Sequence, residues 1–440
     1  MSRLRLQRAY LDGGVHDDVV VEIAGGRFTR VDVGGVGEAE PIPGLALPGF
    51  ANCHSHVFHR ALRGRTQAGA GSFWSWRDQM YAVAHRLDPD SLHALARAAY
   101  AEMLVAGWTC VGEFHYLHHD RDGRRYASPH AMAEALLAAA AEVGIRLTLL
   151  DTCYVAAGIG EAVTGVQRRF SDGDVEAWAE RFATLPEVGD RARIGAAIHS
   201  VRAVPREQLA TVVDAVGARP LHVHLSEQTA ENEQCLVAYG LTPTALLHDA
   251  GALGPRTTAV HATHLTDDDI ALLGSSGTRA CFCPTTERDL GDGVGPSRAL
   301  HAAGSPLTIG SDSHAVVDPF EEMRAVETDE RLVTQRRGRW TPEELLDAGT
   351  RVGHASLGFD DAGRIAVGQR ADLVVVDLGS PRTAGTGGGA GTAVFAATSA
   401  DVREIWADGV RHEVAALRSW SGRALAEAIG PLWSADGGGR

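Results

Sequence analysis

Two histidines, His54 and His56, stand two residues apart directly after the apolar segment 44–50. In an extended strand alternate side chains point to the same face, so both imidazoles are expected on one side of the chain. Imidazole nitrogens placed in this way can bind a transition metal, although two histidines in a surface turn can have the same spacing. The pair by itself leaves both interpretations open, and the rest of the chain has to decide between them.

Four later apolar runs also end in side chains that can bind a metal or move a proton. The strand ends of an α/β barrel meet at one face, which carries the active site. Imidazoles together with one carboxylate suit Zn²⁺ or Fe²⁺ and leave a position open for water. In the run 221–225 the second histidine stands at the strand end and is the expected ligand, whereas the first is expected in the core. The candidate residues in and directly after these runs are His199, His222, His224, Glu227, His261 and Asp312.

The middle of the chain alternates short apolar runs with helical patterns. Some of the helices have clear start signals, such as Thr266 followed three residues later by Asp269, and Thr341 followed by Pro342. Repeated strand and helix units of this number favour a parallel sheet closed into a (β/α)₈ TIM-like barrel. The eight expected strands are the run that leads into His54 and the runs 108–114, 145–150, 193–198, 221–225, 257–262, 279–283 and 306–309.

The two ends of the chain have a different pattern. Residues 1–47 and 364–415 contain short β segments separated by glycine turns, which predicts one small β-sandwich domain built from both termini. The barrel is expected over 48–363, and 416–440 is expected to form a C-terminal helix and tail, with the helix near 421–429. The predicted fold class is therefore α/β, with a barrel and a small β domain beside it.

The charge of the chain argues against several kinds of partner. The formal net charge is −15, and all 41 basic residues are arginine. An acidic chain without a basic stripe is a poor partner for nucleic acid or for an anionic membrane. Because no apolar segment resembles a membrane span or a secretory leader, we expect a cytoplasmic protein. The absence of lysine excludes a lysine Schiff base and a carbamylated lysine that bridges two metals.

Other residues that could bind metals are expected to be structural or solvated. The six cysteines are scattered without a CxxC pair, which is typical of small core residues rather than of a disulfide framework. Strand alternation turns Cys53 away from the neighbouring histidines. His118 and His119 lie in a polar segment and are expected to face solvent.

In their order along the chain, these motifs resemble the amidohydrolase superfamily over nearly the whole sequence. The resemblance extends from Pro48-Gly49-Phe50 and the paired histidines to the segment 368–374. Within the superfamily, the chain is similar to the mononuclear deaminase branch, in which a histidine followed three residues later by a glutamate replaces the carbamylated lysine. The absence of lysine in this chain agrees with that branch.

The resemblance implies one divalent metal and a set of residues around it. The metal would be Zn²⁺ most simply, with Fe²⁺ or Mn²⁺ as alternatives. Glu227 would carry a proton to the leaving nitrogen, Asp312 would take the proton of the attacking water, and His261 would stand beside the reacting carbon. The metal ligands would be His54, His56, His224 and Asp312.

Two arginines, a tyrosine and a histidine are expected at the mouth of the barrel. Two of them belong to the segments 72–78 and 113–116, which are expected in the loops after the first and second strands. Guanidinium groups bind carboxylates through two hydrogen bonds, so Arg77 and Arg202 suit a small acidic substrate. These segments resemble the formimidoylglutamate deiminase family, whose members convert N-formimidoyl-L-glutamate to N-formyl-L-glutamate and ammonia in histidine degradation. The resemblance implies that both arginines and Tyr116 meet the carboxylates of this small dicarboxylate amidine and that His199 meets its formimidoyl group. His59 stands where that family commonly has a glutamine that helps to hold the substrate.

Two other functions are open at this point. Another deaminase of the same branch would act on a purine, pterin or S-adenosylhomocysteine-type ring, for which stacking aromatic and amide side chains are more suitable than paired arginines. A non-catalytic barrel used for protein assembly would be expected to lose its metal ligands, whereas the four ligands and Glu227 are all present. The family also suggests a homodimer.

Overall fold

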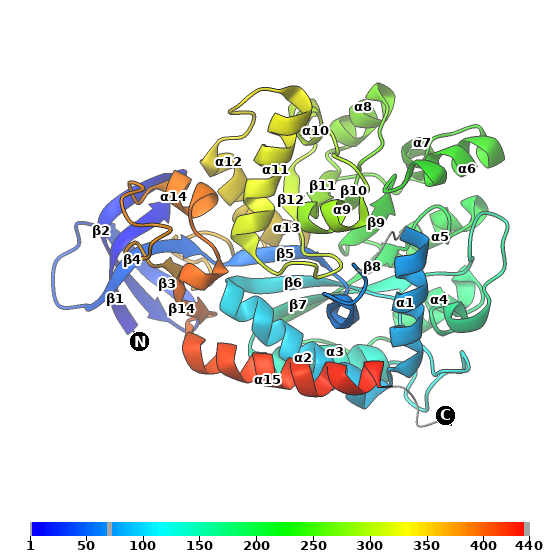
Figure 1. Cartoon of the computed structure of the whole chain (residues 1–440), viewed down its shortest axis with the longest axis horizontal. Coiled ribbons are helices and arrows are strands. Elements are labelled where there is room, and N and C mark those ends of the chain that lie inside the picture. Colours follow the sequence, from blue (N-terminus) through cyan, green and yellow to red (C-terminus); the bar gives the residue numbers. More distant parts are fainter. Residues whose placement is uncertain (1, 68–72, 435–440) are drawn as a thin grey trace.

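The structure is a computed structural model that describes residues 2–67 and 73–434. Its strands form two sheets (Figure 1): an eight-stranded sheet in the middle of the molecule and a seven-stranded sheet at one end. The eight strands are parallel neighbours in chain order, and the smaller sheet takes its strands from both ends of the described chain. The predicted barrel with a small β domain is therefore confirmed.

The barrel strands begin and end close to the predicted positions. Ser55 and Asp312 form an isolated parallel bridge between the first strand and the segment that follows the last, so the sheet nearly closes on itself. Every residue of the second and third strands is buried. The strands are β5 (Phe50–Ser55), β6 (Trp108–His115), β7 (Arg146–Cys153), β8 (Ala192–Ile198), β9 (Leu221–Leu225), β10 (Thr257–His261), β11 (Arg279–Phe282) and β12 (Leu307–Ile309).

Helices follow the barrel strands and cover them. The two start signals seen in the sequence are real caps, because the Thr266 and Thr341 side chains accept hydrogen bonds from the backbone three residues later. The α-helices of the described chain up to residue 356 are α1 (Phe73–Arg86), α2 (Pro89–Ala106), α3 (Ala131–Val143), α4 (Val175–Ala183), α5 (Leu209–Val216), α6 (Thr229–Tyr239), α7 (Pro243–Asp249), α8 (Asp267–Ser276), α9 (Pro284–Leu290), α10 (Ser297–Ala303), α11 (Pro319–Thr334), α12 (Pro342–Asp347) and α13 (Gly353–Ser356).

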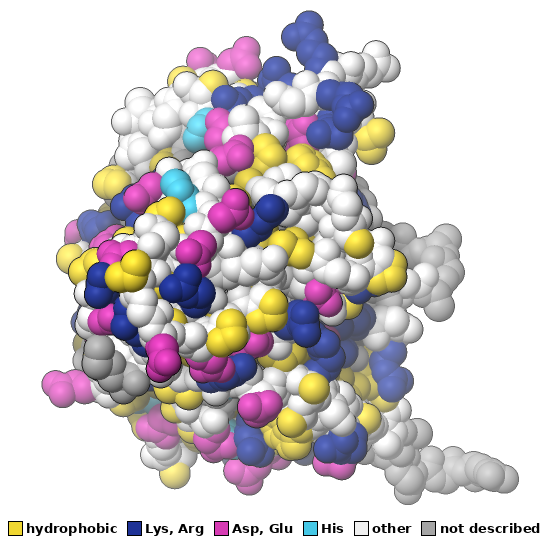
Figure 2. Space-filling model, turned by 90° about the vertical axis from the view of Figure 1, so that its left-hand side faces the viewer, with side chains coloured by type: hydrophobic (Ala, Val, Ile, Leu, Met, Phe, Trp, Pro, Cys, Tyr) yellow, Lys and Arg dark blue, Asp and Glu magenta, His cyan; other side chains and the backbone are white. Residues whose placement is uncertain are grey.

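The small sheet joins the two ends of the chain through one pair of strands. β13 (Leu373–Val376) from the C-terminal part lies antiparallel to β4 (Glu40–Pro48) from the N-terminal part, and a separate apolar cluster packs against this sheet. On the face that Figure 2 shows, acidic and basic side chains are interspersed. The strands of the small sheet are β1 (Ser2–Leu11), β2 (Gly14–Ala24), β3 (Arg27–Val33), β4 (Glu40–Pro48), β13 (Leu373–Val376), β14 (Val402–Ala407) and β15 (Val410–His412).

Two helices follow β13. Short α14 (Ala390–Phe395) precedes β14, and α15 (Val414–Trp433) runs along α2 (Figure 1). α15 is longer at both ends than the expected helix at 421–429, because its apolar stripe continues over the barrel surface and packs there. Among the described residues, no helix combines the length and the apolar character that a membrane crossing requires.

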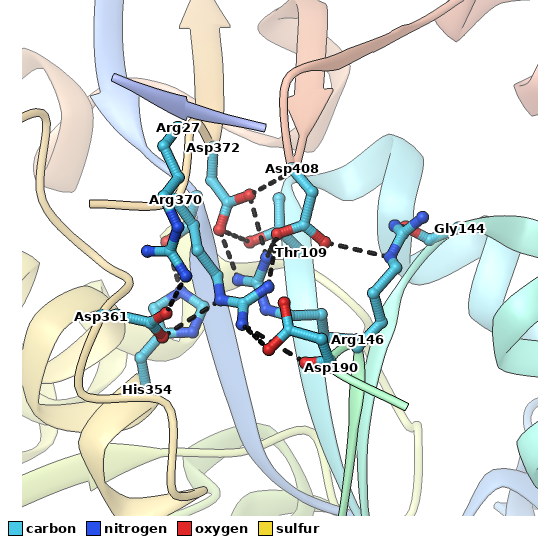
Figure 3. A network of polar contacts seen from close by, with 12 residues as sticks. Arg27, Thr109, Gly144, Arg146, Asp190, His354, Asp361, Arg370, Asp372 and Asp408 are labelled. Atoms are coloured by element: carbon cyan, nitrogen blue, oxygen red, sulfur yellow. Dashed lines mark hydrogen bonds and ion pairs between the residues drawn. The ribbon is translucent and has the colours of Figure 1, made fainter. Parts of the chain in front are cut away.

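A buried network of ion pairs connects the small sheet to the end of the barrel at which the strands begin (Figure 3). Arg146, the first residue of β7, is fully buried and pairs with Asp372 just before β13 and with Asp408 in the turn between β14 and β15. Arg370 adds ion pairs to Asp190, Asp361 and Asp408. The network therefore joins segments that are more than 200 residues apart in the sequence.

We expect Arg146→Met to lower the free energy of unfolding by about 3–5 kcal/mol, because it leaves the carboxylate of Asp372 buried without its partner. Arg351→Met removes an exposed pair with Asp347 and should cost less than about 1 kcal/mol. Urea unfolding of both variants measures the difference. The double variant Arg146→Met/Asp372→Leu should recover much of the loss, and failure to recover any of it would contradict the explanation by an unpaired charge.

Candidate active site

Four candidate metal ligands meet at the carboxyl ends of the barrel strands. His54 lies in β5, His56 directly after it, His224 in β9, and Asp312 three residues after β12. The Nε2 atom of His54 lies 3.1 Å from both His224 Nε2 and Asp312 Oδ1. The Nε2 atom of His56 lies 3.2 Å from the same nitrogen of His224 and 3.3 Å from the same carboxylate oxygen. The structure therefore brings together the four residues that the sequence pointed to.

The spacing and the chemistry of these atoms fit a bound divalent cation. Four ligands at about 2.0–2.1 Å from a tetrahedral Zn²⁺ are separated by about 3.3 Å, which matches the spacing found. The Nδ1 atoms of His56 and His224 each lie 2.9 Å from a backbone carbonyl, that of Phe114 and that of His199. Because Nδ1 then carries the proton, the Nε2 lone pairs face one another, and a cation is the natural partner for them. Burial is the main reason that the pKa of His56 falls to about 3.

His261 is a further candidate ligand at this place. Its nearest donor atom lies within 4.8 Å of donor atoms of His54, His224 and Asp312. The Nε2 atom is 3.9 Å from the Asp312 carboxylate, farther than either His54 or His56. The set that contains His56 is therefore the more closely spaced one, and His261 lies beside it.

The backbone around these residues adopts conformations that side chains other than glycine rarely take. Ser226, His261 and Asp312 have φ angles of +50°, +68° and +38°. Such angles are concentrated at functional sites, where the surrounding structure compensates for their strain. Asp312 is held because its N–H donates to the carbonyl of His54 and its carbonyl accepts from the N–H of His56. These two hydrogen bonds also join the last barrel segment to the first, so the contacts that close the barrel hold Asp312 in place.

Three groups that can move protons surround the metal ligands. His261 Nε2 lies 3.9 Å from both Glu227 and Asp312, and its Nδ1 lies 3.3 Å from Glu287. Burial would lower the pKa of His261, but these carboxylates raise it well above its usual value. Burial raises the pKa of Glu227. Burial also acts on Asp312, but its hydrogen bond to His54 and the neighbouring imidazoles hold its pKa far below the usual range. Of the two carboxylates that face His261 Nε2, Glu227 thus favours a proton and Asp312 does not.

A hollow with about 680 Å³ of empty space opens beside these groups. It is lined by three of the four metal-ligand residues and the proton-moving groups, and also by arginine and aromatic side chains. Arg77 also stacks over Tyr81, with its guanidinium carbon 5.6 Å from the ring centroid. Of the residues singled out from the sequence, those that line the hollow are His56, His59, Arg77, Tyr116, His199, Arg202, His224, Glu227, His261 and Asp312.

His59 is buried and contacts both His56 of the metal-ligand set and Tyr116, which lines the hollow. Its Nε2 forms a 2.9 Å hydrogen bond with the hydroxyl of Tyr116, and its ring centroid lies 4.6 Å from that of His56. His59, His56 and Asp312 also offer donor atoms within 4.8 Å of one another. Because burial lowers the pKa of His59 well below its usual value, the ring is neutral here and can position Tyr116 without adding charge.

Two sequence expectations near the site are wrong. The segment 72–78 was expected to be a loop, but Arg77 lies on helix α1; position 72 itself is outside the described residues. His118 and His119 are buried rather than solvated, with 3% and 2% of their surfaces exposed. His118 Nε2 bonds to the carbonyl of Thr152, and His119 Nε2 lies 3.2 Å from Asp172. These partners satisfy the buried imidazoles, which compensates for their removal from water. The polar composition of the segment gives no sign of such partners.

Several residues of the site were missed from the sequence. Tyr154 lines the hollow and follows β7 directly, so the rule that points to strand ends could have found it. Phe170 also lines the hollow, but it comes from a long connection without a recognisable signal. Glu113 accepts hydrogen bonds from the N–H of Val57 and the hydroxyl of Ser55, at 2.8 Å each, and so fixes the segment that carries His56.

Comparison with known proteins agrees with this geometry. The sequence model of the amidohydrolase family matches residues 45–414. The chain is 37% identical over 454 residues to formimidoylglutamate deiminase of Pseudomonas aeruginosa, covering 98% of this chain and 100% of the relative. It is 31% identical over 358 residues to 8-oxoguanine deaminase of the same organism, covering 78% and 76%. The crystal structure of an amidohydrolase from Brucella melitensis superposes with a TM-score of 0.91 at 32% identity, covering 99% of this chain and 100% of the other.

Proposed function

The chain belongs to the amidohydrolase family and is a hydrolase, and we propose that it converts N-formimidoyl-L-glutamate and water to N-formyl-L-glutamate and ammonia. The observation that carries this proposal is the lining of one hollow by two kinds of group. Three of the metal ligands and Glu227 line it, and Arg77 and Arg202 line it as well. An amidinium group suits the carboxylates, and the two carboxylates of the substrate suit the arginines.

The proposed roles follow from the positions of the side chains. Zn²⁺ is the proposed metal, and when bound it lowers the pKa of a water toward about 7, which supplies a nucleophile at neutral pH. Asp312, which its low pKa keeps ionised, is free to accept the proton of the attacking water. Glu227, whose raised pKa favours the protonated form, delivers a proton to the departing nitrogen, and ammonia leaves. His261, between the two carboxylates, donates a hydrogen bond to the oxygen carried by the tetrahedral carbon.

The substrate side of the hollow orients the amidine. Arg77 and Arg202 bind the two carboxylates, and Tyr116, held by His59, donates a hydrogen bond from its hydroxyl to one of them. His199 lines the hollow beside His224, with ring centroids 5.2 Å apart, and so can contact the formimidoyl group. This arrangement directs the amidine carbon toward the metal-ligand set and keeps the charged ends of the substrate apart.

Ring deamination is the second candidate, because aromatic side chains also line the hollow. Trp76, Tyr81, Tyr154 and Phe170 could stack on a purine or pterin. 8-Oxoguanine deaminase is among the relatives of the chain. The two arginines argue against this reading, since a neutral ring offers no carboxylate to a guanidinium group, whereas the dicarboxylate amidine offers one to each arginine.

Ammonia release by the metal-loaded protein distinguishes the two candidates. We expect kcat/KM for N-formimidoyl-L-glutamate to exceed that for 8-oxoguanine, guanine or S-adenosylhomocysteine by at least about 10³-fold, because a site built around charged partners discriminates strongly against substrates that lack them. A coupled ammonia assay with each compound measures these ratios. Preference for any of the rings would replace the proposed function by ring deamination.

A further inference from the structure

Glu231 lies just outside the hollow but contacts two parts of the site. It is the third residue of α6, and only 1% of its surface is exposed. Its Oε2 atom accepts a hydrogen bond from Arg202 Nε at 2.8 Å. Its Oε1 atom accepts one from the backbone N–H of Ser226 at 3.1 Å. One carboxylate therefore joins the segment that follows β8 to the segment that follows β9.

The contact with Arg202 orients the guanidinium group. Arg202 uses its Nε edge for Glu231, and among the described residues it makes no other hydrogen bond. A guanidinium group has five N–H donors in a fixed plane, so an anchor at Nε fixes the direction of the two terminal nitrogens. Because Arg202 also lines the hollow, Glu231 sets the direction in which this arginine meets an incoming carboxylate.

The contact with Ser226 orients the proton carrier. Ser226 has a φ angle of +50° and directly precedes Glu227. Its N–H is held by Glu231, and its carbonyl accepts a hydrogen bond from the N–H of His264 at 3.0 Å. A non-glycine residue keeps such an angle only when its surroundings hold it, so release of the N–H would let the backbone relax and displace Glu227.

We propose that Glu231 is a positioning residue that couples the capture of a substrate carboxylate by Arg202 to the alignment of Glu227. The inference rests on the proposed function in taking the ligand of Arg202 to be a carboxylate of the amidine substrate. A purely structural ion pair with the same chemistry exists elsewhere in the chain, at Glu327. Its carboxylate is fully buried and accepts hydrogen bonds from Arg331 Nε at 2.7 Å and from the backbone N–H of Trp340 at 2.7 Å.

Glu231→Gln is the test, and Glu327→Gln is the matched control. The amide removes the charge opposite Arg202 and cannot accept hydrogen bonds at both of its ends. We expect KM for N-formimidoyl-L-glutamate to rise about tenfold, since a charge-assisted hydrogen bond is lost. We also expect kcat to fall about tenfold through misalignment of Glu227. Glu327→Gln should lower the melting temperature but leave both constants unchanged.

Double variants separate positioning from general damage. In an Arg202→Met background, Glu231→Gln should raise KM no further but should still lower kcat, because only the contact with Ser226 remains to be lost. Equal kcat/KM for Glu231→Gln and wild type, or a further rise of KM in the double variant, would overturn the inference. A wild type without turnover of this substrate would instead overturn the proposed function.

Glu231→Asp provides a second test in case Glu231→Gln does not fold. Glu231→Asp keeps the charge but shortens the side chain by one methylene, so it can reach one of its two partners at most. We expect it to fold and to show part of the change in kcat or KM. If neither Glu231→Gln nor Glu231→Asp folds, while Glu327→Gln does, Glu231 is a folding element and the positioning role is rejected.

Discussion

Replacement of Glu227 by glutamine is expected to lower kcat by about 10²–10⁴-fold and to change KM little. The amide has nearly the shape of the carboxylic acid, so substrate binding and the fold should be preserved. It cannot release and take up a proton, so expulsion of ammonia loses its proton donor. The effect should therefore appear in the chemical step rather than in binding.

Single-turnover and steady-state measurements of Glu227→Gln at the same pH give kcat and KM separately. Glu322→Gln is a suitable control, because Glu322 is also buried and accepts hydrogen bonds from Thr285, outside the hollow. The control should keep kcat within about twofold, as expected for a group that does not take part in proton transfer. Retention of wild-type kcat by Glu227→Gln would remove Glu227 from the mechanism and leave His261 as the remaining proton donor beside Asp312.

The barrel and most of its site could be predicted from the sequence because one rule covers both. All eight expected strands are present, and their ends carry His54, His224, His261 and Asp312, since parallel strands in a barrel direct their carboxyl ends to one face. His222, two residues before His224, is fully buried, as expected for a residue deeper in the barrel. Strand periodicity therefore determined which residues could meet.

The features that could not be predicted depend on contacts between segments distant in the sequence. Closure of the barrel through Ser55 and Asp312 is a pairing of residues 257 positions apart, which no local pattern reports. Glu231 looks like an ordinary first-turn acid of an exposed helix until Arg202 is placed beside it. Burial of His118 likewise follows from the packing of its connection against β7. The homodimer and the cytoplasmic location stay predictions.

Loss of the metal should abolish turnover, and single ligand variants should reproduce that loss. We expect His56→Ala to bind metal at least about tenfold more weakly and to have no measurable activity without added metal. Only three of the four residues that bind the cation would remain. His56 and His59 lie on one short segment, and both offer donor atoms near Asp312. The two histidines therefore provide a direct comparison of a ligand with its neighbour.

His59→Ala should keep one metal per chain and raise KM, because it removes the hydrogen bond that positions Tyr116 while the Nε2 atoms of His54, His56 and His224 still converge. Metal content after dialysis against a chelator, measured by elemental analysis, distinguishes the two variants without reference to activity. Equal metal loss in both would place His59 among the ligands. Full metal retention by His56→Ala would mean that His261, the other imidazole within reach, is the fourth ligand. The assigned roles of His56 and His261 would then have to be exchanged.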